Sequence, residues 1–255
     1  MKILVIGDII GRPGRKAVAK LLPTLRHKYG IDLIIGNGEN AAGGLGLTPN
    51  TAQELFDSGI DVITSGNHIW SHKELFPYLD GNFPLIRPLN YPPAAPGHGY
   101  LLQDNILVVN LIGRTFIGNF DCPFRAMDKL LAEFKDKANV IVVDFHAEAT
   151  SEKVAMGWYL DGRVSALLGT HTHVGTIDAH ILPHGTAYVT DIGMVGPANS
   201  VIGDKVDSVI SRFLTQIPSR LSVGEGSVTF NAILVEVDED TGKATDIKRI
   251  EKLVD

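Results

Sequence analysis

The chain has 255 residues, of which 44% are hydrophobic and 20% are charged. These fractions lie near globular averages and exclude a disordered or fibrous protein. Its 23 basic and 29 acidic residues give a net charge of −6, which opposes broad binding to a nucleic-acid backbone. The single cysteine, Cys122, excludes an internal disulfide and a multi-thiolate metal site. Any bound metal must therefore use nitrogen and oxygen ligands.

The apolar segments are short. Ile3 to Ile6, for example, falls far below the roughly 20 residues that cross a bilayer. This segment reaches Gly7 and Asp8 at once, which is typical of a buried strand and not of a signal peptide. We therefore expect no membrane partner and a cytoplasmic location. The length suits one α/β core, so residues 1–255 are predicted to form a single domain, and homo-oligomerisation is left open.

The first third of the chain repeats a pattern of strand, polar cluster and helix. Apolar, β-rich segments predict strands at 2–7, 32–36 and 61–64. Helical spacing predicts helices at 15–28, from Thr48 to about Asp57, and near 72–79. Alternating strands and helices indicate a parallel sheet, and ligands gather beyond the carboxyl ends of its strands.

The rest of the chain predicts further strands and one helix. Five prolines break 84–98 into a loop, for which we expect a lid or a wall. Strands are predicted at 106–112 and 139–145, with a helix near 123–136 between them. A strand at 164–168 and short strands near 186–190, 228–236 and 245–250 are expected to complete a mixed second sheet.

Four of the nine histidines lie at or just past predicted strand ends, beside Asp8, Glu39 and Asn67; they are His68, His146, His171 and His173. Imidazole nitrogen and carboxylate oxygen together suit iron, manganese or zinc. Two adjacent metals need a bridging ligand, which a carboxylate can supply, so Glu39 is the predicted bridge. His171 and His173 would project to the same side of an extended segment, and each could face one metal of a pair roughly 3.5–4 Å apart.

Five ordered motifs resemble the calcineurin-like metallophosphoesterases, and specifically their YmdB-like bacterial subfamily. The motifs are Gly7-Asp8-Ile9-Ile10-Gly11, Gly38-Glu39-Asn40, Gly66-Asn67-His68, Asp144-Phe145-His146-Ala147-Glu148-Ala149-Thr150 and Gly169-Thr170-His171-Thr172-His173. The resemblance covers almost the whole chain. It implies an α/β fold, namely a metallophosphoesterase-type sandwich of two mixed β-sheets flanked by helices. It also implies phosphodiesterase action, including on cyclic nucleotides such as the 2′,3′-cyclic type.

The chain departs from the wider family at the first motif, because Ile10 stands where that family has a metal-binding histidine. The resemblance implies that Asn40 replaces it. The wider family also has aspartate in place of Glu39, and a carboxylate in place of Ile69. The group that orients His68 is therefore not identified by the sequence.

The resemblance implies two metal ions per chain with seven ligands. It assigns the first ion to Asp8, Glu39, Asn40 and His173, and the second to Glu39, Asn67, His146 and His171. Iron is expected, with manganese or zinc as alternatives, because all three accept this ligand set. The bare site would carry a charge of about +2 when the ions are counted. An acidic protein could thus attract a small phosphorylated substrate, such as a nucleotide.

A water or hydroxide shared by the two ions would attack phosphorus in line without a side-chain base. His68 adjoins Asn67, belongs to neither ligand set and has a near-neutral intrinsic pKa, so it is the predicted general acid. A surface or capping role is the simpler interpretation for His72, and a hydrogen bond to a turn is the simpler one for Asp191. Glu148 could either support a metal ligand or be an exposed loop carboxylate.

Two other functions compete with phosphoester hydrolysis. Gly7 to Gly11 follows a strand and precedes a helix, as in dinucleotide-binding oxidoreductases, but Ile9 occupies the place of a required glycine. The alternative that stays open is a metal-binding regulatory or scaffold protein with little catalysis. Turnover by metal-loaded protein distinguishes the two.

Overall fold

The computed structural model describes residues 1–81 and 83–255. A first sheet has the strand order β2-β11-β12-β1-β3-β4, with β13 paired to β12. Its strands are β1 (Lys2–Ile6), β2 (Asp8–Ile9), β3 (Leu33–Asn37), β4 (Val62–Thr64), β11 (Met194–Pro197), β12 (Val228–Val237) and β13 (Ala244–Val254). Strand β1 pairs in parallel with β3 and antiparallel with β12, so the sheet is mixed.

A second sheet has the order β5-β6-β7-β8-β10-β9. Its strands are β5 (Tyr100–Gln103), β6 (Ile106–Ile112), β7 (Val140–His146), β8 (Ala166–Thr170), β9 (His180–Ile181) and β10 (Ala187–Val189). The central strands run parallel, whereas β5 and β9 pair antiparallel with their neighbours. The carboxyl ends of β6, β7 and β8 therefore share one edge.

The two sheets pack face to face, and helices cover their outer faces. In β1, Ile3 and Val5 face the second sheet, while Leu4 and Ile6 face the helices. A strand buried on both faces must be apolar throughout, which explains its unbroken hydrophobic run. Burial of each such side chain stabilises the fold by about 1.5–3 kcal/mol.

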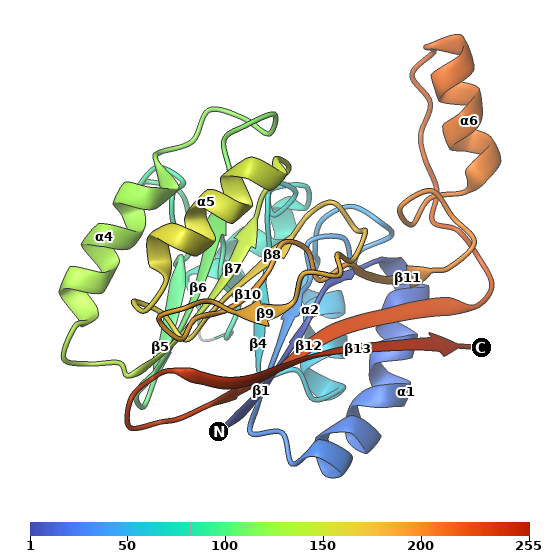
Figure 1. Ribbon diagram of the computed structural model, residues 1–255. Coiled ribbons are helices and arrows are strands. Elements are labelled where there is room, and N and C mark those ends of the chain that lie inside the picture. The colour runs from blue at the N-terminus through green and yellow to red at the C-terminus, as the bar shows by residue number, and fades with distance from the viewer. Residues whose placement is uncertain (82) are drawn as a thin grey trace.

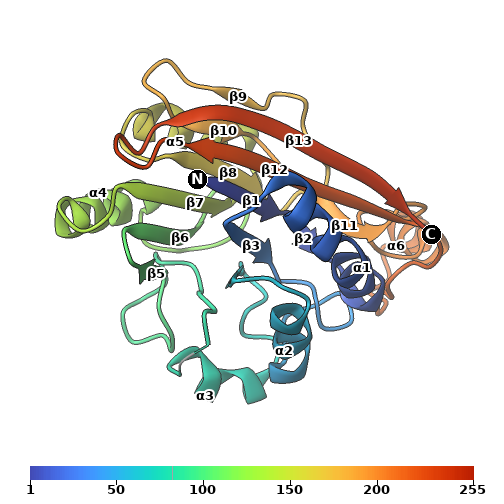
Figure 2. The same ribbon diagram turned by 90° about the horizontal axis from the view of Figure 1, so that it is seen from below.

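The helices lie on opposite sides of the paired sheets (Figure 2). Helices α1 (Gly11–Tyr29) and α2 (Pro49–Asp57) pack on the first sheet, and α4 (Pro123–Phe134) and α5 (Thr150–Leu160) pack on the second. The predicted sandwich of two mixed sheets flanked by helices is confirmed. None of the helices in the described part of the chain has the length and apolar character needed to cross a membrane.

Three further helical segments lie outside these layers. A 3-10 turn, η1 (Lys73–Leu75), leads into α3 (Phe76–Leu79), while α6 (Val206–Thr215) projects away from the body (Figure 1). Segment 84–98 packs between the sheets, where Leu85 bridges to Ile63 of β4 and Leu89 donates to Asn110 of β6. Of the expected lid or wall, these contacts with both sheets agree with the wall.

One expectation about the strands is wrong. The strands predicted near 228–236 and 245–250 belong to the first sheet, because β12 pairs antiparallel with β1 and β13 pairs with β12. Helix α5 was not expected. It contains Gly157, whose added Cβ would lie 2.6 Å from the ring of Tyr188, so a residue that disfavours helix is needed for close packing.

Candidate metal centre

The sandwich brings the predicted polar clusters to one edge. Asp8 lies in β2, Glu39 follows β3 by two residues, and Asn67 follows β4 by three. From the second sheet, His146 is the last residue of β7 and His171 directly follows β8. Because the carboxyl ends of parallel strands meet at the same edge, residues from both sheets converge where the sheets face each other.

Three side chains from different strand ends lie in close contact. The distance from Glu39 Oε2 to His146 Nε2 is 3.1 Å, and that from His171 Nδ1 to His146 Nε2 is 2.9 Å. Each of the three offers a ligand atom within 4.8 Å of the others. Asn67 follows Gly66, where an added Cβ would meet Glu39 and His146, and its Oδ1 atom is buried with no hydrogen-bond partner among the described residues.

A second group of contacts surrounds Asp8. Its Oδ1 atom lies 3.8 Å from His173 Nε2 and, within the described chain, accepts no hydrogen bond. Asn40 Nδ2 lies 3.1 Å from His173 Nε2. Rotation of this amide by 180° would exchange its nitrogen and its oxygen, and Oδ1 would then lie on the side of His173.

The donor set fits a cation. Its atoms are carboxylate oxygen, amide oxygen and imidazole nitrogen, the ligands of iron, manganese and zinc. Two of its buried acceptors, Asp8 Oδ1 and Asn67 Oδ1, lack a donor in the described structure, and a positive ion would satisfy them. The cluster therefore has the chemistry of a divalent metal site.

Without an ion, the buried acids and imidazoles compensate one another. Burial raises the pKa of Asp8 to about 6. Burial also acts to raise the pKa of Glu39, but His146, His68 and His171 outweigh it and lower that pKa to about 2. Burial disfavours the charged form of His146, yet Glu39 and Asp8 raise its pKa to about 9. Glu39 and His146 thus form a buried ion pair.

A buried polar network supports His146 from behind. Thr170 Oγ1 lies 2.9 Å from His146 Nδ1 and donates to Asp144 Oδ1 at 2.7 Å. Asp144 also accepts from Thr64 at 2.5 Å and from Asn37 at 3.0 Å. Such outer partners fix the ring orientation of a metal-binding histidine. These partners were not predicted from the sequence, because their contacts form only where the first sheet packs against the second.

The loop that carries His171 and His173 is not extended, so the condition under which the two rings would project to the same side is not met. His171 has φ 100° and His173 has φ 66°, both in the left-handed region. Asp191 holds this loop by accepting from Thr172 through its backbone nitrogen at 3.2 Å and its hydroxyl at 2.7 Å. Lys153 pairs with Asp191 at 2.7 Å, and both residues are fully buried. No local sequence pattern indicates that Lys153 is buried.

His68 lies at the outer side of the cluster. Its Nδ1 atom is 3.1 Å from Asn40 Oδ1 and 3.1 Å from Glu39 Oε1, so these two residues orient the ring. Its side chain is 36% exposed and lines a cavity of about 590 Å³. Burial lowers the pKa of His68 from its ordinary value. The ring is thus in contact with both the cluster and the open cavity.

Gly66 is a functional position that the sequence did not single out. A Cβ at this residue would lie 1.8 Å from Glu39 Oε2 and 2.3 Å from His146 Nε2. No real side chain can approach so closely, so the convergence of Glu39 and His146 requires glycine here.

The weaker candidates lie at the periphery. His72 Nε2 is 2.9 Å from the Leu45 carbonyl oxygen, which agrees with a structural role. Glu148 Oε2 is 3.1 Å from His171 Nε2, although its side chain is 47% exposed. It touches the ring from outside the buried part.

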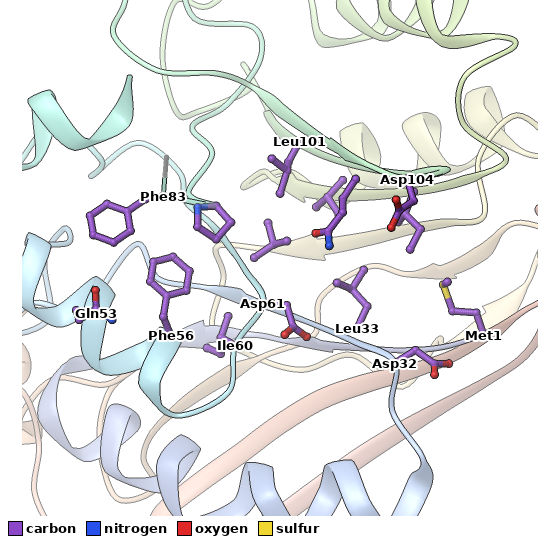
Figure 3. A pocket seen from close by; sticks show the side chains of 15 residues that line it. Met1, Asp32, Leu33, Gln53, Phe56, Ile60, Asp61, Phe83, Leu101 and Asp104 are labelled. Atoms are coloured by element: carbon purple, nitrogen blue, oxygen red, sulfur yellow. The ribbon is translucent and has the colours of Figure 1, made fainter. Parts of the chain in front are cut away.

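A separate cavity of about 620 Å³ opens between the sheets at their opposite end (Figure 3). Phe83 and Leu101 face Phe56, Ile60 and Leu33 across it. None of the predicted metal ligands lines this cavity. The candidate metal ligands therefore lie at one end of the sandwich, and this cavity lies at the other.

The chain is similar to known proteins over almost its whole length. A family model described as "YmdB-like protein" matches residues 4–250. The chain is 48% identical over 254 residues to a 2′,3′-cyclic-nucleotide 2′-phosphodiesterase of Bacillus subtilis, covering 98% of this chain and 96% of that one.

Two solved structures share the fold. A hypothetical protein from Thermus thermophilus has a TM-score of 0.94 and 44% identity, with 100% of each chain covered. A novel phosphatase from Mycoplasma pneumoniae also has a TM-score of 0.94, at 34% identity, with 100% of this chain and 94% of that one covered.

Proposed function

The chain belongs to the YmdB-like protein family, and we propose that it is a metal-dependent phosphodiesterase that opens 2′,3′-cyclic nucleotides. The resemblance predicted from the five motifs is confirmed by the family match. The observation that carries the proposal is the buried cluster at the strand ends, with acceptor atoms on Asp8 and Asn67 that lack donors in the described structure.

We assign the ligands as the sequence predicted them. Glu39 would bridge two divalent ions, because it is a buried carboxylate with two oxygens and lies in contact with His146. His146, His171 and Asn67 would complete one ligand set, and Asp8, Asn40 and His173 the other. Iron is the metal that we propose, with manganese or zinc as alternatives.

The ions would supply Lewis-acid stabilisation of phosphate charge and a nucleophile from water at neutral pH. The chain's own residues fix the geometry around them. Thr170 orients His146, Asp191 holds the loop of His171, and Gly66 leaves room for Glu39 to reach its partners. The substrate phosphate would enter from the cavity that His68 lines.

His68 would act as the general acid. Cleavage of a P–O bond leaves an alkoxide that needs a proton, and the ring stands between the cluster and the cavity. Contacts with Asn40 and Glu39 occupy Nδ1, so Nε2 is the nitrogen available to donate.

Activity of the purified protein tests this proposal. Metal content is measured, and turnover of adenosine 2′,3′-cyclic phosphate is followed beside that of bis-p-nitrophenyl phosphate. We expect two metals per chain, hydrolysis of both compounds, and loss of activity on chelation that added metal restores. A fully metallated protein that hydrolyses neither compound would favour the regulatory or scaffold function instead.

A further inference from the structure

The cavity beside the cluster extends to the segment that projects from the body. Asn40, His68 and His173 line its inner part. Arg212 of α6 and Arg220, which follows that helix, line its outer part. The metal centre and two guanidinium groups thus face one space of about 590 Å³.

The projecting segment, residues 202–224, is fixed to the metal centre at its base. The Ile202 carbonyl oxygen lies 2.7 Å from His173 Nδ1. The two ends of this segment are joined by backbone hydrogen bonds. The Lys205 nitrogen donates to the Ser222 oxygen at 2.9 Å, and the Gly224 nitrogen donates to the Gly203 oxygen at 2.8 Å. The position of the two arginines is therefore coupled to that of His173, which the same segment orients.

The two guanidinium groups have no anionic partner in the described part of the protein. Neither Arg212 nor Arg220 has a carboxylate within 4.0 Å or a side-chain hydrogen bond there. Asp204 is the one acid among the cavity-lining residues. Burial raises the pKa of Asp204, while His173 and Arg212 act to lower it. Arg212 and Arg220 are both exposed, so the lining of this cavity presents two guanidinium groups to solvent against one carboxyl group.

We infer that Arg212 and Arg220 bind a second phosphoryl group of the substrate, attached at the 5′ position of the nucleoside. The inference rests on the proposed function. Guanidinium is always charged, and its planar fork matches phosphate oxygens bidentately. A simple 2′,3′-cyclic nucleotide has one phosphoryl group, which would lie at the cluster, and it would leave both arginines without a partner.

The chemistry that produces cyclic phosphates points to the same substrate class. When a 2′-hydroxyl attacks the adjacent phosphorus of RNA, the new 2′-O–P bond forms, the P–O5′ bond breaks, and the 5′ oxygen leaves with a proton. The cyclic phosphate then ends a fragment that retains a phosphodiester on its 5′ side. The net negative charge opposes long RNA, so a short fragment or a 5′-phosphorylated nucleotide is the fitting ligand.

Three probes test the inference: adenosine 2′,3′-cyclic phosphate, the same nucleotide with a 5′-phosphate, and a diadenosine fragment ending in the cyclic phosphate. We expect kcat/KM to be about tenfold or more higher for at least one phosphorylated probe, the effect of one charge-assisted hydrogen bond. The two phosphorylated probes distinguish a terminal phosphate from an internucleotide link. In the double variant Arg212→Gln, Arg220→Gln, the ratio of kcat/KM for the phosphorylated probe to kcat/KM for the unphosphorylated one should fall to about one. In the wild type, this ratio should be lower at high salt.

Arg125→Gln is the control, because it removes one guanidinium charge from an exposed position on α4 that lines a different cavity. It should keep the wild-type preference. Equal kcat/KM for all three probes in the wild type, or a preference that survives the double variant, would overturn the inference. Calorimetric binding of the three probes makes the same comparison in the absence of turnover, so failure of the proposed function is told apart from failure of the arginine site.

Discussion

The cluster has an inner half built by strand ends and an outer half built by loops. The inner side chains are at most 1% exposed; they are Asp8, Glu39 and His146. The outer histidines are 36%, 21% and 13% exposed; they are His68, His171 and His173. The inner half is fixed by the packing of two sheets, whereas the outer half depends on hydrogen bonds from loops. Loss of an inner side chain should therefore reduce metal retention most, whereas loss of His68, the outer histidine outside both proposed ligand sets, should affect substrate chemistry.

The largest effect is expected from Glu39→Gln in the inner half. The amide keeps the shape but loses the charge, so it cannot serve as an anionic bridge. We expect metal content to fall from two ions per chain to at most one, and turnover of bis-p-nitrophenyl phosphate to fall by roughly a thousandfold. Elemental analysis and initial rates measure both. Glu54→Gln, at an exposed glutamate paired with Arg15, is the control. Full metal content with wild-type turnover in Glu39→Gln would refute the bridge.

His68→Ala, in the outer half, should separate chemistry from metal binding. We expect metal content to be retained and turnover of adenosine 2′,3′-cyclic phosphate to fall by about 100-fold, because the leaving alkoxide loses its proton donor. Bis-p-nitrophenyl phosphate should lose much less, since p-nitrophenolate leaves without a proton. Equal losses with both substrates would exclude the general-acid role.

Thr170→Val probes the support behind the inner half. The change removes the hydroxyl 2.9 Å from His146 Nδ1 while keeping the side-chain shape. We expect metal affinity to fall by about tenfold, as for loss of an outer partner of a metal ligand. Competition with a chelator measures this. Thr245→Val, at an exposed position on β13, should leave the affinity unchanged, and the same result in Thr170→Val would show that His146 needs no support.

The smallest effect is expected from Glu148→Gln. The carboxylate touches His171 at 3.1 Å, but its side chain is 47% exposed, and exposed pairs contribute little. Turnover should change by less than about fivefold. A larger loss would show that Glu148 contributes to turnover as strongly as a buried side chain of the cluster.

The strand ends and the residues beyond them could be predicted from the sequence, because both depend on local pattern. Helix α2 illustrates this: Thr48 caps it through a reciprocal contact with Thr51, and the expected range to Asp57 agrees with the structure. A parallel arrangement then places consecutive strand ends together.

Features that depend on distant pairing could not be predicted. Strand β12 pairs with β1 although their residues are more than 200 positions apart in the sequence, and the local spacing of residues does not predict this pairing. The same holds for the buried pair of Lys153 and Asp191 and for the packing of Gly157 on Tyr188. The left-handed backbone of His171 accompanies the loop's contacts with Asp191, which the local sequence pattern does not indicate.

The most direct test of the two-ion centre is anomalous scattering at the iron and manganese edges, from crystals of protein purified without added metal. We predict two anomalous difference peaks. One should lie among Glu39, His146 and His171, and the other beside Asp8 and His173. Full-occupancy density for water in place of both peaks, or a single ion away from Glu39, would contradict it.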